Sequence, residues 1–152
     1  MTLCLVAMTL GVVMTSCEKE EPNGSITVKM RNKDNGNTKI EFSASSVCIN
    51  EANNFQVDGD RGFGYNGQEF KEEIEIASVG KVNGLGSITT IPKSGWTDEA
   101  SVFVGHGYVV RWRRSYSDIY TDYSYGRIFV HDEIVSTGGG IIGYTVSYIE
   151  GM

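Results

Sequence analysis

The sequence predicts an all-β fold, an antiparallel β-sandwich or small barrel of about eight short strands. Apolar and polar residues alternate in several runs along the chain, and this period of two is typical of half-buried strands. Glycine is abundant, with 19 residues, whereas proline is scarce, with 2. Clusters of Gly, Asn and Asp separate the alternating runs, as turns do. We find no amphipathic helical pattern of about 10 or more residues.

The chain begins with a segment that is typical of a secretion signal. Residues 1–16 are apolar or small and contain no charge, and Cys17 follows directly on Ser16. A polar stretch with three acidic residues comes next. A buried core helix is the alternative, since the run is short for a membrane span, but its place before a charged break favours a lipoprotein signal. We predict a signal peptide at 1–16, an acylated Cys17 with an acidic tether at 17–24, and one all-β domain at 25–152.

This signal predicts where the protein is located. Cleavage before Cys17 leaves that residue to carry the lipid, and two or more acyl chains give stable anchoring without a transmembrane helix. We expect an outer-membrane lipoprotein. The acidic residues beside Cys17 resemble the tethers of surface-exported lipoproteins, and display on the surface or in the periplasm are both open alternatives. Cys4 leaves with the signal, and Cys48 then has no partner for an intramolecular disulfide. Its apolar neighbours favour a buried thiol over a reactive one.

The first body strands show the strongest hairpin signal. Ile26, Val28 and Met30 alternate with polar residues, and residues 39–42 alternate again after Asn35-Gly36. Asn-Gly suits a hairpin because both central turn residues can take a positive φ. We therefore predict that these two strands pair with each other. Further strands are expected at residues 46–50, 54–57, 73–79, 87–91, 100–113, 125–135 and 141–149.

Composition and motifs argue against several classes of function. The chain has 13 basic and 19 acidic residues and a net charge of −6, which disfavours nucleic acid as a partner. It has no Gly-x-Ser-x-Gly, no phosphate-binding glycine loop and no His-Glu-x-x-His. Residues 58–62 resemble part of a calcium loop, but the following positions do not continue the pattern. We expect no catalytic residues, no cofactor and no metal site.

The two histidines are the candidates for the alternative, a small hydrolase. His106 falls on one face with Val104 and Tyr108, which favours a core or edge histidine. His131 precedes Asp132 and Glu133, but adjacent strand residues point to opposite faces, so only Glu133 is able to share its face. Catalysis at either histidine requires a nucleophile or a carboxylate that the fold brings close.

The segment from Arg113 to Tyr125 is the best candidate for a binding loop. It holds four tyrosines spaced with Ser, Thr and Asp. Tyrosine offers a large contact area at low entropic cost, and serine supplies adaptable hydrogen bonds. The alternative is a twisted hairpin whose tyrosines pack on neighbouring strands. The predicted ligand-binding residues are Tyr116, Tyr120 and Tyr123, with Asp118 and Asp122 as acceptors.

Several motifs from residue 79 onward resemble a known family. The first is Val79-Gly80-Lys81-Val82-Asn83-Gly84-Leu85-Gly86-Ser87-Ile88. The others lie at residues 91–96, 105–111, 127–130, 134–137 and 139–143. Together they resemble a family of small Bacteroidetes lipoproteins of unknown function over residues 72–149. The resemblance implies a lipid-anchored envelope protein and supplies no activity.

The leading hypothesis is a non-catalytic binding or assembly module at the outer membrane. Its partners would be the membrane, through the lipid on Cys17, and a glycan or an envelope protein. The second hypothesis is a structural protein that pairs with an envelope partner through an exposed strand edge. The third is the small hydrolase, which no motif supports.

Overall fold

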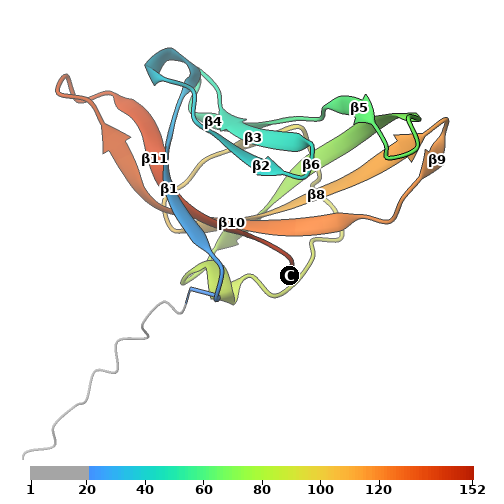
Figure 1. Ribbon diagram of the computed structural model, residues 1–152. Helices are drawn as coiled ribbons and strands as arrows, with labels where there is room; N and C mark the ends of the chain where they lie inside the picture. The colour runs from blue at the N-terminus through green and yellow to red at the C-terminus, as the bar shows by residue number, and fades with distance from the viewer. Residues whose placement is uncertain (1–20) are drawn as a thin grey trace, which may run out of the picture.

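The computed structural model describes residues 21–152, which form two antiparallel sheets that face each other (Figure 1). The predicted signal at 1–16 and Cys17 lie outside the described residues. The first sheet has the order β1 (Ile26–Arg31), β11 (Ile141–Glu150), β10 (Ser124–Val135), β8 (His106–Tyr116), β6 (Glu69–Lys81), β5 (Arg61–Phe63), and β9 (Ile119–Tyr120) pairs with β8. The second sheet has the order β2 (Lys39–Phe42), β3 (Ser45–Ile49), β4 (Asn54–Asp58), β7 (Glu99–Ser101). The predicted all-β antiparallel fold is confirmed.

The main core lies between the two sheets. Alternate residues of each strand point to the same face, so Tyr108 and Val110 of β8 meet Phe42 of β2 and Phe55 of β4. All four are fully buried. The ring centroids of Phe55 and Tyr108 are 4.9 Å apart with the rings nearly perpendicular, an arrangement that aromatic pairs favour.

A second, smaller core covers the opposite face of the first sheet. The connection from β6 to β7 contains a 3₁₀ turn, η2 (Leu85–Ser87), and packs Leu85 and Ile88 against Val109 and Phe129. The central strands β8 and β10 are therefore buried on both faces. The strand predicted at 87–91 is wrong. Ile88 is buried against the first sheet without joining it, because a short tight turn also places a side chain to face inward, whereas Ile91 is exposed.

The predicted first hairpin is also wrong. β1 pairs with β11, and β2 pairs with β3. Between β1 and β2, the turn η1 (Lys33–Asn35) and Gly36, with φ of 111°, carry the chain from one sheet to the other. Met30 and Phe42 are both fully buried in the same core from opposite sides. Asn-Gly therefore marks a corner between sheets here, since a positive φ serves either kind of reversal.

The single strand predicted at 100–113 is divided between the two sheets. β7 belongs to the second sheet and β8 to the first, and Gly105, with φ of 78°, lies in the loop between them. The expected shared face therefore breaks at this loop: Val104 is exposed, whereas Tyr108 is buried. The predicted strand is interrupted here because the chain crosses from one sheet to the other. That crossing needs a reversal of direction, which a residue in extended conformation cannot make.

The Tyr108 hydroxyl makes the stability of this junction depend on pH. It donates to the Ser101 carbonyl oxygen at 2.7 Å and accepts from the Phe103 N–H at 3.0 Å. Burial raises the pKa of Tyr108 to about 12, above the value of about 10 of an exposed tyrosine. The unfolded chain therefore loses this proton first, so the stabilisation is complete below about pH 10 and is lost between about pH 10 and 12.

We expect the free energy of unfolding to fall by roughly 2–3 kcal/mol across that window from this residue alone, at about 1.4 kcal/mol per pKa unit. Urea unfolding followed by circular dichroism from pH 9 to 12 measures it. Tyr108→Phe is the control, because it keeps the ring and has no proton to lose. A variant whose stability falls as steeply as that of the parent would contradict the assignment.

Candidate functional site

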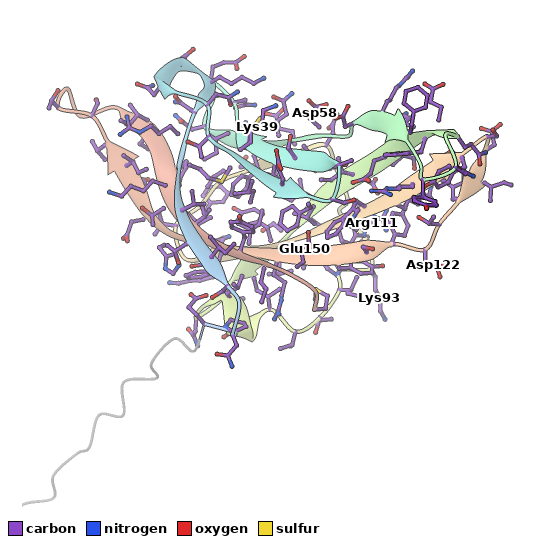
Figure 2. The ribbon with its side chains drawn as sticks, in the orientation of Figure 1. Lys39, Asp58, Lys93, Arg111, Asp122 and Glu150 are labelled. Atoms are coloured by element: carbon purple, nitrogen blue, oxygen red, sulfur yellow. The ribbon has the colours of Figure 1, made fainter. Side chains whose placement is uncertain are left out.

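The hairpin of β8 and β9 separates the predicted tyrosines. Tyr116 pairs with Ile119 across a two-residue loop, and both loop residues, Ser117 and Asp118, have a positive φ. Two positive φ values are typical of a type I′ turn, whose twist matches that of the flanking strands. Asp118 is therefore a turn residue at an exposed tip, and Asp122 is exposed in the segment after β9. Figure 2 shows Asp122 near the right-hand end of the domain, beyond Arg111.

Tyr120 and Tyr123 lie on the outer face of the first sheet. The Cζ atom of Arg111 is 4.2 Å from the Trp96 ring centroid and 4.4 Å from that of Tyr123. The Cζ atom of Arg113 is 4.1 Å from the Tyr120 centroid and 4.7 Å from that of Tyr123. Rings and guanidinium groups thus alternate in the series Trp96, Arg111, Tyr123, Arg113 and Tyr120, which we call the guanidinium–aromatic ladder. Such contacts are attractive because the ring face is negative.

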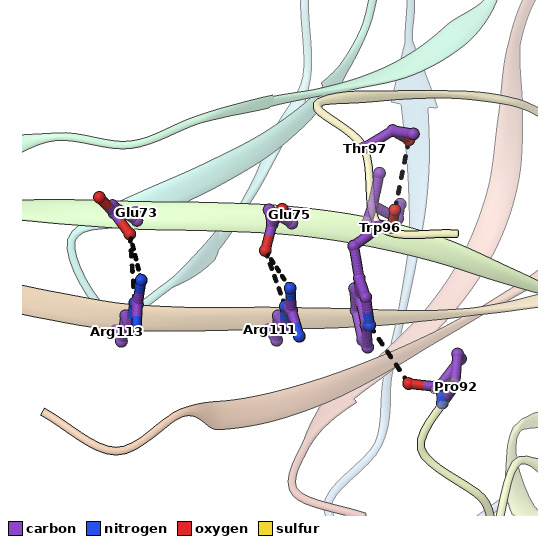
Figure 3. Close-up of polar contacts among 8 residues, drawn as sticks. Glu73, Glu75, Pro92, Trp96, Thr97, Arg111 and Arg113 are labelled. Carbon is purple, nitrogen blue, oxygen red and sulfur yellow. Dashed lines mark hydrogen bonds and ion pairs between the residues drawn. The ribbon is translucent and has the colours of Figure 1, made fainter. Parts of the chain in front are cut away.

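Two carboxylates of β6 complete the ladder. Glu75 Oε2 lies 2.6 Å from Arg111 Nη2, and Glu73 Oε2 lies 3.0 Å from Arg113 Nη2. These residues are direct cross-strand partners, and Figure 3 shows the two ion pairs side by side. An open groove of 470 Å³ adjoins both ion pairs and is also lined by Val57 and Asp98. Since its guanidinium groups already contact rings and carboxylates, we interpret the ladder as a support for the β9 hairpin.

Tyr116 lies on the opposite face of the hairpin. Its ring centroid is 5.8 Å from that of the buried Phe70, and it shares its face with Ile119, as cross-strand partners do. The two residues line an open groove of 550 Å³, which we call the end groove. The opposite wall of the end groove is the β5–β6 turn, with lining residues Gly64, Tyr65, Asn66 and Gln68. A Cβ atom on Gly64 would lie 3.3 Å from the Tyr116 ring, so glycine lets the turn approach the tyrosine closely.

Aromatic and amide groups reach solvent at the end groove. Tyr65 is fully exposed, Ile119 is 73% exposed and the adjacent Phe63 is 76% exposed. The side chain of Asn66 accepts from the Gln68 N–H at 3.1 Å and donates to Gln68 Oε1 at 3.4 Å. Both amides are thereby ordered while they remain exposed.

Sequence reasoning did not predict Tyr65, Asn66 or Gln68 as site residues. The available signal is Asn66-Gly67 before the alternating residues of β6, which is typical of a hairpin turn. Turn residues are exposed, so an aromatic residue in that turn marks a candidate contact.

The histidines do not form an accessible catalytic pair in the described part of the chain. His131 Nε2 lies 2.5 Å from Ser147 Oγ and 3.6 Å from Glu21 Oε1, a combination that resembles a nucleophile with its base. Ser147, however, is fully buried, and its Oγ also lies 2.8 Å from Thr27 Oγ1. A substrate cannot reach this oxygen, so the contact holds β1, β10 and β11 together. His106 packs against the Phe103 ring, with centroids 5.2 Å apart.

Cys48 behaves as the sequence predicts. It is 4% exposed in the core, and burial raises the pKa of its thiol. A buried thiol with a raised pKa is a poor nucleophile, so the interpretation as a small buried residue is confirmed. Within residues 21–152, no group of three or more His, Cys, Asp or Glu side chains is placed to hold a metal ion.

Comparison of the chain with protein-family models, with curated proteins and with solved structures finds no match. In the part of the chain that the structure describes, no helix has both the length and the apolar character needed to cross a membrane.

Proposed function

We propose that this protein is a lipid-anchored, non-catalytic binding module of the cell envelope, and that its ligand is a glycan held in the end groove. The observation that supports the proposal most directly is the pairing of one exposed and one half-buried aromatic ring with ordered amides in one groove. Tyr65 and Tyr116 supply the rings, and Asn66 and Gln68 supply the amides. The lipid on Cys17, inferred from the sequence, supplies the anchor.

The chemistry of these groups suits a sugar. An aromatic ring offers a large apolar surface with a polar hydroxyl at its edge, which matches the apolar face and polar rim of a pyranose. Each side-chain amide has donors and an acceptor, so Asn66 and Gln68 are able to bind adjacent hydroxyl groups. The volume of 550 Å³ is in the range of about 300–1,000 Å³ of small-molecule sites.

The predicted tyrosines divide their roles in this proposal. Tyr116 contacts the ligand, and Asp118 is an acceptor at the tip of the hairpin that bounds the groove. Tyr120 and Tyr123 act indirectly, because their contacts with Arg111 and Arg113 fix the segment that follows the hairpin. A rigid groove loses less entropy when a ligand binds.

The strand-edge hypothesis receives less support from the fold. β1 is the longer of the two edge strands of the first sheet, and it carries exposed Lys29 and Arg31. Charged side chains on an edge strand are a usual protection against pairing with another chain. A partner strand would have to accommodate both of these cations.

A glycan array probed with the purified protein tests the proposal. For a glycan found in this way, we expect the double variant Tyr65→Ala with Tyr116→Ala to weaken binding by roughly 100-fold or more, since it removes two aromatic contacts and each central contact contributes about 2 kcal/mol or more. Phe103→Ala is the matched control, because it removes an exposed ring at the far end of β8 and should leave the affinity unchanged.

Two outcomes would contradict the proposal. If the double variant binds the glycan with the same affinity as the parent protein, the glycan site lies elsewhere on the domain. A parent protein that binds no glycan would exclude this class of ligand, and an envelope protein would become the leading partner, to be sought by cross-linking from intact cells.

A further inference from the structure

An exposed apolar loop lies at the opposite end of β8 from the end groove. Phe103 is 55% exposed and Val104 is 44% exposed. Both lie in the connection between β7 and β8, just before the Gly105 reversal. The two apolar side chains are consecutive in one loop, which makes the loop a candidate contact.

This loop is close to the point where the described chain begins. The Gly105 N–H donates to the Val130 carbonyl oxygen at 2.8 Å. The next residue, His131, has its Nε2 atom 3.6 Å from Glu21 Oε1. Glu21 is the first described residue, so two short contacts connect the start of the described chain to the apolar loop. Figure 1 shows the described chain entering at the bottom of the view, away from β5 and β9 at the upper right.

The length of the tether limits how far this end lies from a membrane. Cys17 precedes Glu21 by four residues, and a fully extended chain spans at most about 3.6 Å per residue, or roughly 14 Å here. If Cys17 carries the lipid, the bilayer surface lies within that distance of Glu21. The apolar loop, which is linked to Glu21 through His131 and Val130, is then an exposed apolar surface that the tether holds near the bilayer.

We propose that Phe103 and Val104 insert into the interfacial region of the bilayer, so that the domain rests on the membrane by this end. The proposal depends on the lipid anchor that forms part of the proposed function. Apolar side chains gain free energy when they leave water for the acyl boundary. The exposed Lys81, which pairs with His106 at the start of β8, is a donor for headgroup phosphates at the same end.

This orientation deepens the proposed function. β8 runs from His106, beside Phe103, to Tyr116 in the end groove. A strand rises about 3.3 Å per residue, so these ends are roughly 33 Å apart. The membrane contact at one end therefore displays the glycan site at the other, on the side that faces away from the lipid.

Site-specific fluorescence on the lipidated full-length protein tests the proposal. Val104→Cys and Ile119→Cys each receive an environment-sensitive nitrobenzoxadiazole label, and Cys48 is buried away from the reagent. The proteins are reconstituted into phosphatidylcholine vesicles with and without nitroxide-labelled lipid. Zwitterionic lipid suits a chain with a net charge of −6, because an anionic surface would repel it.

We expect the nitroxide lipid to quench the label at residue 104 by about two-fold or more, with a blue-shifted emission, because a residue in the acyl boundary meets the quencher directly. The label at residue 119 should be unaffected. Lys81→Cys, at the same end as Val104, gives a second position that should report proximity to the headgroups.

The outcomes separate the inference from the anchor on which it depends. Vesicle flotation and intact mass first establish whether the protein carries lipid, with Cys17→Ala as the control that should neither float nor be quenched. A protein without lipid on Cys17 would overturn the anchor and the inference together. A protein that floats with an unquenched label at 104, or with quenching at 119, would overturn the membrane contact alone.

Discussion

Replacing Glu72 with alanine is expected to lower the free energy of unfolding by about 3 kcal/mol or more, in the range of a broken buried ion pair. Glu72 is 1% exposed, and its Oε2 lies 3.0 Å from Arg114 Nε. Its carboxylate also accepts from the Ala44 N–H at 3.1 Å and from Ser43 Oγ at 3.2 Å. One side chain thereby joins β6 and β8 of the first sheet to the β2–β3 turn of the second.

Loss of the carboxylate leaves several groups without their partner. The Ala44 N–H loses its acceptor, and Arg114 loses the hydrogen bond with Glu72 that raises its pKa. The Arg114 side chain is 38% exposed, so water compensates part of its charge and the cost falls near the lower end of the range. Because Arg114 also lies 4.5 Å from the Phe70 ring centroid, the loss should reach the end groove through Phe70.

Glu73→Ala and Glu75→Ala are the matched controls for this prediction. Both residues form ion pairs on the same strand, but their side chains are 33% and 36% exposed. Exposed pairs contribute about 0–1 kcal/mol, so these variants should unfold close to the parent. Guanidinium unfolding monitored by far-ultraviolet circular dichroism gives all three values. A Glu72→Ala variant as stable as the Glu73→Ala variant would show that the buried carboxylate does not hold the sheets together.

Gly143→Ala is expected to destabilise the fold by about 3 kcal/mol or more, because both the backbone conformation and the available space oppose a side chain. Gly143 has φ of 155°, and a Cβ atom there would lie 2.1 Å from the Met30 carbonyl oxygen and 2.8 Å from Arg31 Cα. These are backbone atoms of β1, which cannot rotate away as a side chain would. The strand would have to separate from β11 to make room.

Gly140→Ala is the control for Gly143→Ala. It lies just before β11, has no positive φ, and its nearest neighbour would be Ser136 Oγ at 3.7 Å from the new Cβ atom. Ordinary surface substitutions stay within about 0.5 kcal/mol. Thermal and chemical unfolding of the two variants compare them directly, and equal stabilities would mean that β1 adapts to a Cβ atom at residue 143.

Strand positions were the most predictable part of the fold. The strands expected at 125–135 and 141–149 differ from β10 and β11 by one residue at a single end. Alternation along a chain reports which residues face a core, and that information is local. The strand predicted at 87–91 is absent and the one predicted at 100–113 is divided, because apolar spacing reports burial and does not say which sheet, if any, a segment joins.

Strand pairing was the least predictable part. The partner of β1 is β11, and Ile26 lies opposite Tyr148. The Asn35-Gly36 signal suggested a neighbour along the chain, but a local turn signal cannot weigh the competing burial of Met30 and Phe42 from opposite sides of one core. Which strands are adjacent depends on how all the apolar side chains of the domain are buried together.

The same distinction applies to the candidate site. The sequence alone determined an all-β domain and a tyrosine-rich segment between two strands, and it predicts an anchor at Cys17. The tertiary structure decided that Tyr116 lies apart from Tyr120 and Tyr123, because alternate residues of a hairpin occupy opposite faces. It also decided that Tyr65, far away along the chain, shares a groove with Tyr116, since contacts between distant segments depend on how the sheets close around their core.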